Sequence, residues 1–224
     1  MSYSITGIVV ARSRKFNGYC VVVFDILRKT YYRLTSDNSL RHDHELSHEE
    51  CCYKNGSLIE LRDLIELKVK SFERVKDKVQ TENLIIDPTF TFNFKEKYNF
   101  NTMINHLENN LCKDYHIFSN QFDSLTPLQA QSLRKSFTIA SVTNLRFFKV
   151  LTSNGVDHRC VCSFDYNGIR YNNMRVTISE SKEEDIRKYA ERFYRKATIG
   201  ISYGHVYEKT NLHYKFVCSF LGGY

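Results

Sequence analysis

The chain has 224 residues, 42% hydrophobic and 25% charged, so wholesale disorder is excluded. It contains 2 Pro, 9 Gly and 14% aromatic residues, which favour strands, and no apolar run approaches the ~18 residues of a membrane-spanning helix. The net charge of +7 is uneven, since residues 137–224 carry 13 Lys and Arg against 8 Asp and Glu. This bias indicates either an anionic partner or a plain basic surface.

The first 88 residues are typical of strands separated by turns. Runs of β-branched and aromatic residues predict strands at 5–11, 19–25, 30–34 and 61–69. A polar string, Gln80-Thr81-Glu82-Asn83, precedes a further apolar run that ends at the turn Asp87-Pro88. We therefore assign residues 1–88 to a first small β-barrel.

Residues 89–136 have a different pattern. Apolar residues at 103, 104, 107 and 111 have helical spacing, and Asn101 or Thr102 is a suitable N-cap. Pro127 marks the first turn of a second short helix. We interpret 89–136 as a short, ordered helical connector.

Strands return from residue 137 onwards. Apolar runs predict strands at 137–142, 145–152, 159–166, 197–203 and 213–220. Asn167-Gly168 between two aromatic runs is a strong hairpin signal. Acids at its start and bases at its end predict one helix near 182–196. Residues 137–224 are therefore a second small β-barrel.

The predicted fold class is mainly β with a few helices. Two five-stranded barrels of the OB type, joined by the helical connector, fit the number and order of strands. A single continuous β-sandwich is the alternative.

Several short strings resemble the dual OB domain-containing proteins, a prokaryotic family. They are Ile8-Val9-Val10-Ala11-Arg12-Ser13-Arg14-Lys15, Gly18-Tyr19-Cys20-Val21-Val22, Tyr31-Tyr32-Arg33-Leu34, Gln80-Thr81-Glu82-Asn83, Ile199-Gly200-Ile201-Ser202-Tyr203-Gly204 and His213-Tyr214-Lys215-Phe216-Val217. The chain departs from the family pattern at Leu34, where a Pro is expected. The resemblance implies a recognition module in a prokaryotic defence or DNA-processing system, and no named reaction.

The main candidate ligand site is a group of basic and aromatic residues on the early strands. Cations neutralise phosphate and flat rings stack on bases, and OB barrels use strands 2 and 3 for this purpose. Because neighbours on a strand point to opposite faces, one of the two adjacent tyrosines is expected in the core. The group consists of Arg12, Arg14, Lys15, Tyr19, Tyr31, Tyr32 and Arg33.

Two further candidates are polar residues outside this group. Gln80, Glu82 and Asn83 either read a base or ribose, or brace a turn through local backbone bonds. Lys215 either contacts phosphate or is an outward-facing strand charge.

Metal binding and catalysis have weak support. The histidines and cysteines His42, His44, His48, Cys51 and Cys52 match no standard zinc spacing, so no metal or other cofactor is predicted. We find no phosphate-binding glycine loop, nucleophile elbow or HExxH motif, and predict no catalytic residue. Seven irregularly spaced cysteines and no secretory signal indicate free thiols and a cytoplasmic location without a membrane partner.

The sequence therefore favours a module that binds nucleic acid, preferentially single-stranded, or a nucleotide. The alternative is a protein–protein interaction module that docks on an effector protein. A cryptic nuclease or nucleotide hydrolase is a third possibility.

Overall fold

The computed structural model describes residues 3–15, 17–37, 45–70, 79–152, 155–179 and 181–224. The chain divides into two compact units, one ending at Asn110 and the other beginning at Leu111. The residues predicted as a connector, 89–136, are thus shared between the two units.

The described part of the first unit contains a barrel of five strands, with β6 as an added edge strand. They are β1 (Tyr3–Lys15), β2 (Gly18–Asp25), β3 (Thr30–Thr35), β4 (Asp63–Val69), β5 (Asn83–Ile85) and β6 (Asn93–Lys97). The sheet order is β5-β3-β2-β1-β4-β6, and the β3–β5 pairing is parallel. A bridge between Val69 and Ile86 closes the ring from β4 back to the end of β5. This is the Greek-key order of an OB barrel.

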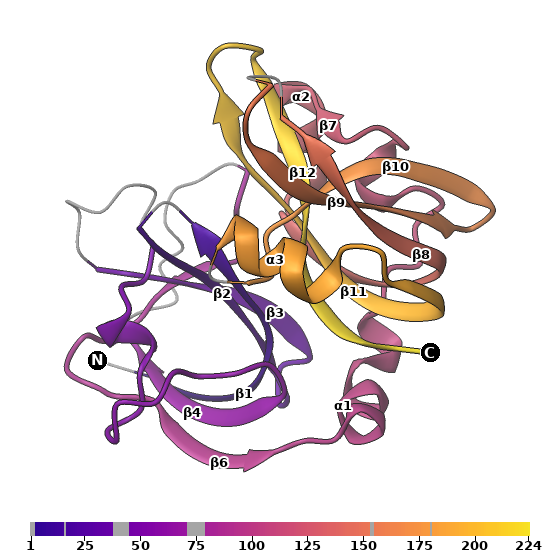
Figure 1. Ribbon diagram of the computed structural model, residues 1–224. Coiled ribbons are helices and arrows are strands. Elements are labelled where there is room, and N and C mark those ends of the chain that lie inside the picture. The colour runs from indigo at the N-terminus through magenta and orange to yellow at the C-terminus, as the bar shows by residue number, and fades with distance from the viewer. Residues whose placement is uncertain (1–2, 16, 38–44, 71–78, 153–154, 180) are drawn as a thin grey trace. The chain divides into compact units, whose positions relative to one another are not determined.

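The second unit repeats this order with longer strands. Its strands are β7 (Ser124–Leu125), β8 (Phe137–Leu151), β9 (His158–Tyr166), β10 (Ile169–Val176), β11 (Phe193–Tyr207) and β12 (Leu212–Gly223). The order is β10-β9-β8-β11-β12-β7, and a parallel β10–β12 pairing closes the barrel. In Figure 1 these strands run from brown-red β8 to yellow β12, and β7 pairs with the start of β12. The prediction of a mainly β fold with two OB-like barrels is confirmed.

The cores follow from the apolar runs that predicted the strands. In the first barrel, alternating residues of β1 and β2 point inward, among them Ile5, Val9, Val21 and Val23, all 1% exposed or less. Each fully buried Val or Ile side chain contributes roughly 1.5–3 kcal/mol relative to an exposed one. The runs therefore stabilise the barrel as well as marking its strands.

Asn167 and Gly168 form the hairpin turn that the sequence predicts between β9 and β10. Asn167 has φ 50° and Gly168 φ 75°, and the flanking residues Tyr166 and Ile169 pair. Both central residues of this turn need positive φ, which Asn and Gly adopt most readily.

The helix predicted near 182–196 is too long. Helix α3 spans Lys182–Tyr189, with Ser181 as its N-cap, and Glu191 then adopts φ 69°. Phe193 already pairs with Arg146 of β8, so the basic end of the predicted helix belongs to β11. Strand pairing has overridden the local helical pattern there.

The N-cap of the first helix and the division of the strand after residue 137 also differ from the prediction. Helix α1 (Phe100–Leu107) is capped by Asn99, whose side chain accepts from the Thr102 backbone N–H at 2.9 Å. The strands predicted at 137–142 and 145–152 are one strand, β8, irregular near Asn144, whose φ is 51°. Helix α2 (Pro127–Leu133) begins at Pro127 as predicted.

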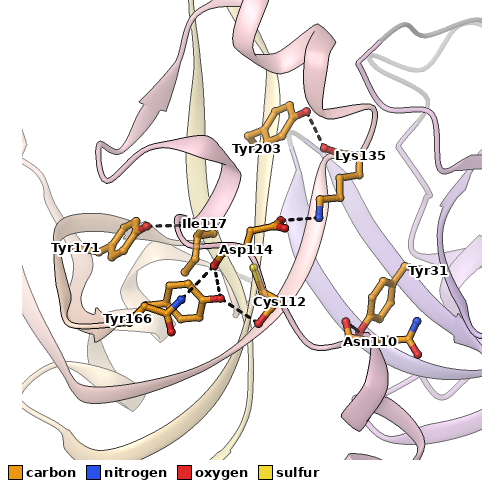
Figure 2. A network of polar contacts seen from close by, with 10 residues as sticks. Tyr31, Asn110, Cys112, Asp114, Ile117, Lys135, Tyr166, Tyr171 and Tyr203 are labelled. Carbon is orange, nitrogen blue, oxygen red and sulfur yellow. Dashed lines mark hydrogen bonds and ion pairs between the residues drawn. The ribbon is translucent and has the colours of Figure 1, made fainter.

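Tyrosine hydroxyls tie the segment 111–136 to the second barrel (Figure 2). Tyr166 donates to the carbonyls of Cys112 and Asp114 at 3.0 and 2.8 Å. Tyr171 accepts the Ile117 backbone N–H at 2.9 Å, and Tyr203 donates to the Lys135 carbonyl at 2.7 Å. This segment is therefore part of the second unit's hydrogen-bonded structure.

All seven cysteines are free thiols, and four of them are buried, as the sequence predicts. Among the described residues, no helix is long and apolar enough to cross a bilayer.

Candidate nucleic-acid interface

The first three predicted cations lie at the paired ends of β1 and β2. Arg14 pairs with Tyr19 in the strand register, and the Arg12 guanidinium carbon lies 5.5 Å from the Tyr19 ring centroid. Tyr19 itself is 9% exposed and belongs to the hydrophobic core cluster. Arg12, Arg14 and Lys15 are half-buried. Tyr19 thus acts as a core ring beneath Arg12, and its face is not open for a base.

The β3 residues of the group are divided between surface and interior. The Tyr31 hydroxyl donates to the Asn110 carbonyl at 3.0 Å, and Tyr32 packs against the core cluster; both rings are half-buried. Arg33 is 4% exposed and pairs with Asn83 in the parallel β3–β5 register. The strand therefore offers parts of two rings, while its cation lies in the interior.

The polar string before β5 braces that strand against β3. Gln80 is 1% and Asn83 5% exposed, and the Asn83 side-chain amide donates to Gln80 Oε1 at 3.3 Å. The Arg33 backbone N–H donates to the Glu82 carbonyl at 3.0 Å. Among the described residues, Gln80 Nε2 and Asn83 Oδ1 are buried without hydrogen-bond partners. These bonds fit the alternative in which the polar string stabilises a turn. Binding of a base or ribose by Gln80, Glu82 and Asn83 stays a prediction.

Lys215 is neither outward-facing nor placed to meet a phosphate. It is 0% exposed, and its ammonium donates to the carbonyls of Ile117 and Asn120 at 2.9 and 2.8 Å and to Asn120 Oδ1 at 2.8 Å. Burial lowers the pKa of Lys215 to about 7, and Asp123 opposes this shift. The alternation of β12, with Val217 also inward, puts residue 215 on the interior face.

A second basic–aromatic group lies on the outer face of the second barrel. Arg175 of β10 stands over the Tyr214 ring of β12, with 4.6 Å between guanidinium carbon and ring centroid. The Tyr207 ring lies 6.2 Å from Tyr214 and is 49% exposed. Arg159 of β9 and Arg175 repel each other electrostatically. We call Arg159, Arg175, Tyr207 and Tyr214 the Arg–Tyr cluster.

The two guanidiniums of this cluster are poorly compensated. Burial and then the neighbouring Arg175 lower the pKa of Arg159, while Asp123 raises it. Both Nε atoms are buried and have no hydrogen-bond partner among the described residues. Like charges that repel across a strand pair are stabilised when an anion binds between them. The cluster therefore has the chemistry of a phosphate site beside stacking rings.

The position of the Arg–Tyr cluster corresponds to the ligand-binding face of an OB barrel. β9 and β10 are the second and third strands of their barrel, and Tyr207 and Tyr214 flank the short β11–β12 loop, 208–211. OB barrels bind oligonucleotides on strands 2 and 3 and on the loop between strands 4 and 5. The basic bias of residues 137–224 and the string His213-Tyr214-Lys215 were the sequence signals for it. Arg159 carries no distinguishing local pattern.

The weak metal candidate is not assembled in the described residues. His42 and His44 lie outside them, and Cys51 is buried, which raises the pKa of its thiol. The described residues contain no group of three or more His, Cys, Asp or Glu side chains placed to hold a metal ion.

Comparison with known proteins agrees with the strand order of both units. No curated protein matches the chain. A family model described as a dual OB-containing domain matches residues 5–220, nearly the whole chain. With two closed barrels of OB topology in the structure, this match identifies the chain as a member of the dual OB-containing domain family.

Proposed function

We propose that this protein binds single-stranded nucleic acid through the Arg–Tyr cluster of its second barrel. The observation that carries the proposal is the adjacent pair Arg159 and Arg175, with unpartnered Nε atoms, on the strands that OB barrels use for oligonucleotides. One guanidinium can donate two parallel hydrogen bonds to a phosphate group. Its positive charge also neutralises the negative charge of the nucleic-acid backbone.

Single strands fit the cluster better than duplexes. Tyr207 is 49% exposed and forms an edge contact with Tyr214, so a ring face is open to an unpaired base. Stacking of a base on an aromatic ring contributes roughly 1–3 kcal/mol and is sequence-tolerant. We therefore expect affinity for unpaired segments with little sequence preference.

The first barrel would add a second set of contacts. Tyr31 and Tyr32 lie half-buried on β3, one of the two strands of an OB ligand face, and Arg12, Arg14 and Lys15 lie at the end of β1, paired with β2. Their contribution is weaker in this proposal because Tyr19 and Arg33 are buried.

The proposal includes a cellular setting. We infer a recognition module that acts beside an effector protein in a prokaryotic defence or DNA-processing system, within the reducing cytoplasm. The seven free thiols support the reducing compartment. Co-purification of a partner that survives high salt would support an effector contact.

The test is a fluorescence-anisotropy titration with single-stranded DNA, single-stranded RNA and duplex at ~50 and ~200 mM salt. We expect binding of the single strands that weakens with salt. Arg175→Gln should reduce the slope of log affinity against log salt by about 0.7, the value for one phosphate contact on a single strand. Tyr207→Ala should weaken binding roughly tenfold, since one stacking contact is lost.

Matched variants control for charge and for general loss of an aromatic residue. Arg187→Gln removes the same charge from the exposed face of α3, and Tyr224→Ala removes a ring that is 75% exposed at the end of the chain. Neither should change the affinity by more than about twofold. Salt-independent or absent binding by the wild-type protein would falsify the proposal and favour a protein partner.

A further inference from the structure

The first unit contains a pocket that no part of the proposed interface uses. It has a volume of about 790 Å³ and is lined by residues between Tyr53 and Asp63 and between Thr89 and Lys97. None of its lining residues belongs to β2 or β3, so it lies apart from the strands that form the OB ligand face of this barrel. The volume is within the range of roughly 300–1,000 Å³ that small-molecule sites occupy.

Aromatic rings form the apolar part of the pocket. Tyr53 and Phe94 meet edge to face with 5.7 Å between ring centroids, and Phe94 is 47% exposed. The Tyr53 hydroxyl donates to Asp63 at 2.6 Å, which fixes the orientation of its ring. Phe92, 4% exposed, pairs with Tyr53 through a parallel bridge and belongs to the core. A fixed ring beside an exposed one is a surface on which a flat molecule can stack.

The charges of the lining compensate one another. The Lys97 ammonium contacts the Glu60 carboxylate and lies 3.6 Å from the Asp63 carboxylate. Asp63 also accepts the Glu60 backbone N–H at 2.8 Å. With Lys54 the pocket holds two cations and two anions, so it does not favour phosphate or another strongly charged ligand.

Neutral polar groups remain at the rim. Asn55 uses its Oδ1 to accept from Ser57 N and Oγ at 3.0 and 2.7 Å, and Asn93 uses its Nδ2 to donate to Glu66 at 3.3 Å. Both residues are exposed, and these bonds do not use Asn55 Nδ2 or Asn93 Oδ1. One amide thus presents a donor and the other an acceptor, which match the edge of a heterocycle.

We propose that this pocket binds an uncharged, planar heterocycle of the nucleobase class, in the form of a nucleoside. The ring would stack on Phe94 and meet Tyr53, which stands nearly perpendicular to Phe94, edge to face; its polar edge would bond to Asn55 and Asn93. The inference does not depend on polymer binding by the second barrel, because it rests on different residues and on a charge-neutral site.

The test is a titration of the ¹⁵N-labelled full chain with adenosine, guanosine, cytidine and uridine, followed by amide chemical shifts. We expect at least one nucleoside to shift the amides of the two lining segments, 53–63 and 89–97, with an affinity that is unchanged between low and high salt. Phe94→Ala should weaken this binding at least tenfold. Phe193→Ala, which removes a 59% exposed ring from β11, should leave it unchanged.

A second variant separates loss of the site from loss of the fold. Tyr53→Phe keeps the ring and removes only its bond to Asp63, so it should retain most of the affinity. No shift in either lining segment with any of the four nucleosides overturns the inference, as does equal binding by Phe94→Ala. Arg175→Gln distinguishes the two proposals, since it should weaken polymer binding and leave nucleoside binding intact.

Discussion

At the scale of single residues, the buried ammonium of Lys215 is the most consequential feature. It donates to three oxygens of the segment that precedes the second barrel, while burial lowers its pKa to about 7. A lysine in the unfolded chain has a pKa of about 10.4. Between these two values the unfolded chain binds more protons than the folded one, so this residue makes stability increase with pH.

We expect Lys215→Met to change the pH dependence of unfolding as well as the stability. In the wild type, Lys215 should raise the free energy of unfolding by about 1 kcal/mol per pH unit between about pH 7 and pH 9. The variant lacks this term and leaves three buried oxygens without a donor, so its deficit relative to the wild type should grow with pH. Urea denaturation at both pH values measures the difference.

The difference between the two proteins is the informative quantity. Burial also raises the pKa of Cys162, which makes stability decrease as the pH rises above the thiol's ordinary value, but this contribution is common to both proteins. A deficit that is constant from about pH 7 to pH 9 would show that Lys215 is charged in the folded protein throughout that range.

The same residue shows what the sequence could and could not predict. Strand alternation places residue 215 on the face of Val217, so its inward position was available from the sequence. Its acceptors, nearly a hundred positions earlier, were not, because a lysine has no local signal for distant carbonyls. Arg33 is buried by the parallel pairing of β3 with β5, which is equally non-local.

At the scale of elements, local chemistry predicted turns and strand cores but not where strands stop. Asn167-Gly168 and the apolar run of β2 were predicted because each signal lies within a few residues. The end of α3 and the unbroken course of β8 both depend on the pairing of β8 with β11, which brings together residues some 50 positions apart. Long-range pairing of this kind has no short sequence pattern.

The segment 111–136 is expected to be essential for folding of the second barrel. A fragment of residues 111–224 should unfold cooperatively, whereas 137–224 should not fold. The shorter fragment removes the partners of Tyr166, Tyr171, Tyr203 and Lys215, shown in part in Figure 2. Each lost hydrogen bond costs about 0.5–1.5 kcal/mol, and loss of the buried side chains Ile117 and Phe118 costs roughly 1.5–3 kcal/mol each, so together they approach the ~5–15 kcal/mol stability of a domain.

Circular dichroism during thermal unfolding of both fragments provides the measurement. The fragment 1–110, which keeps the Tyr31–Asn110 hydrogen bond, is the positive control for an isolated barrel. A cooperative transition for 137–224 would mean that the preceding segment is an attachment and that the boundary at 137 is the correct one.

At the scale of the whole molecule, two barrels of the same topology differ in charge. Residues 111–224 carry 16 Lys and Arg against 10 Asp and Glu, while residues 1–110 carry 16 against 15. The Arg–Tyr cluster lies in the basic unit and the charge-neutral pocket in the other. This division suits one unit to a polyanion and the other to an uncharged ligand.

The salt dependence of binding should therefore belong to the second unit. We expect fragment 111–224 to reproduce most of the full chain's slope of log affinity against log salt, at about 0.7 per phosphate contacted. Fragment 1–110 should show a smaller slope, because its 16 Lys and Arg residues are almost balanced by 15 Asp and Glu residues. Anisotropy titrations of the three proteins with one labelled single strand measure these slopes. Equal slopes for the two fragments would assign equal numbers of phosphate contacts to both barrels, and Arg12, Arg14 and Lys15 would then be the residues to substitute next.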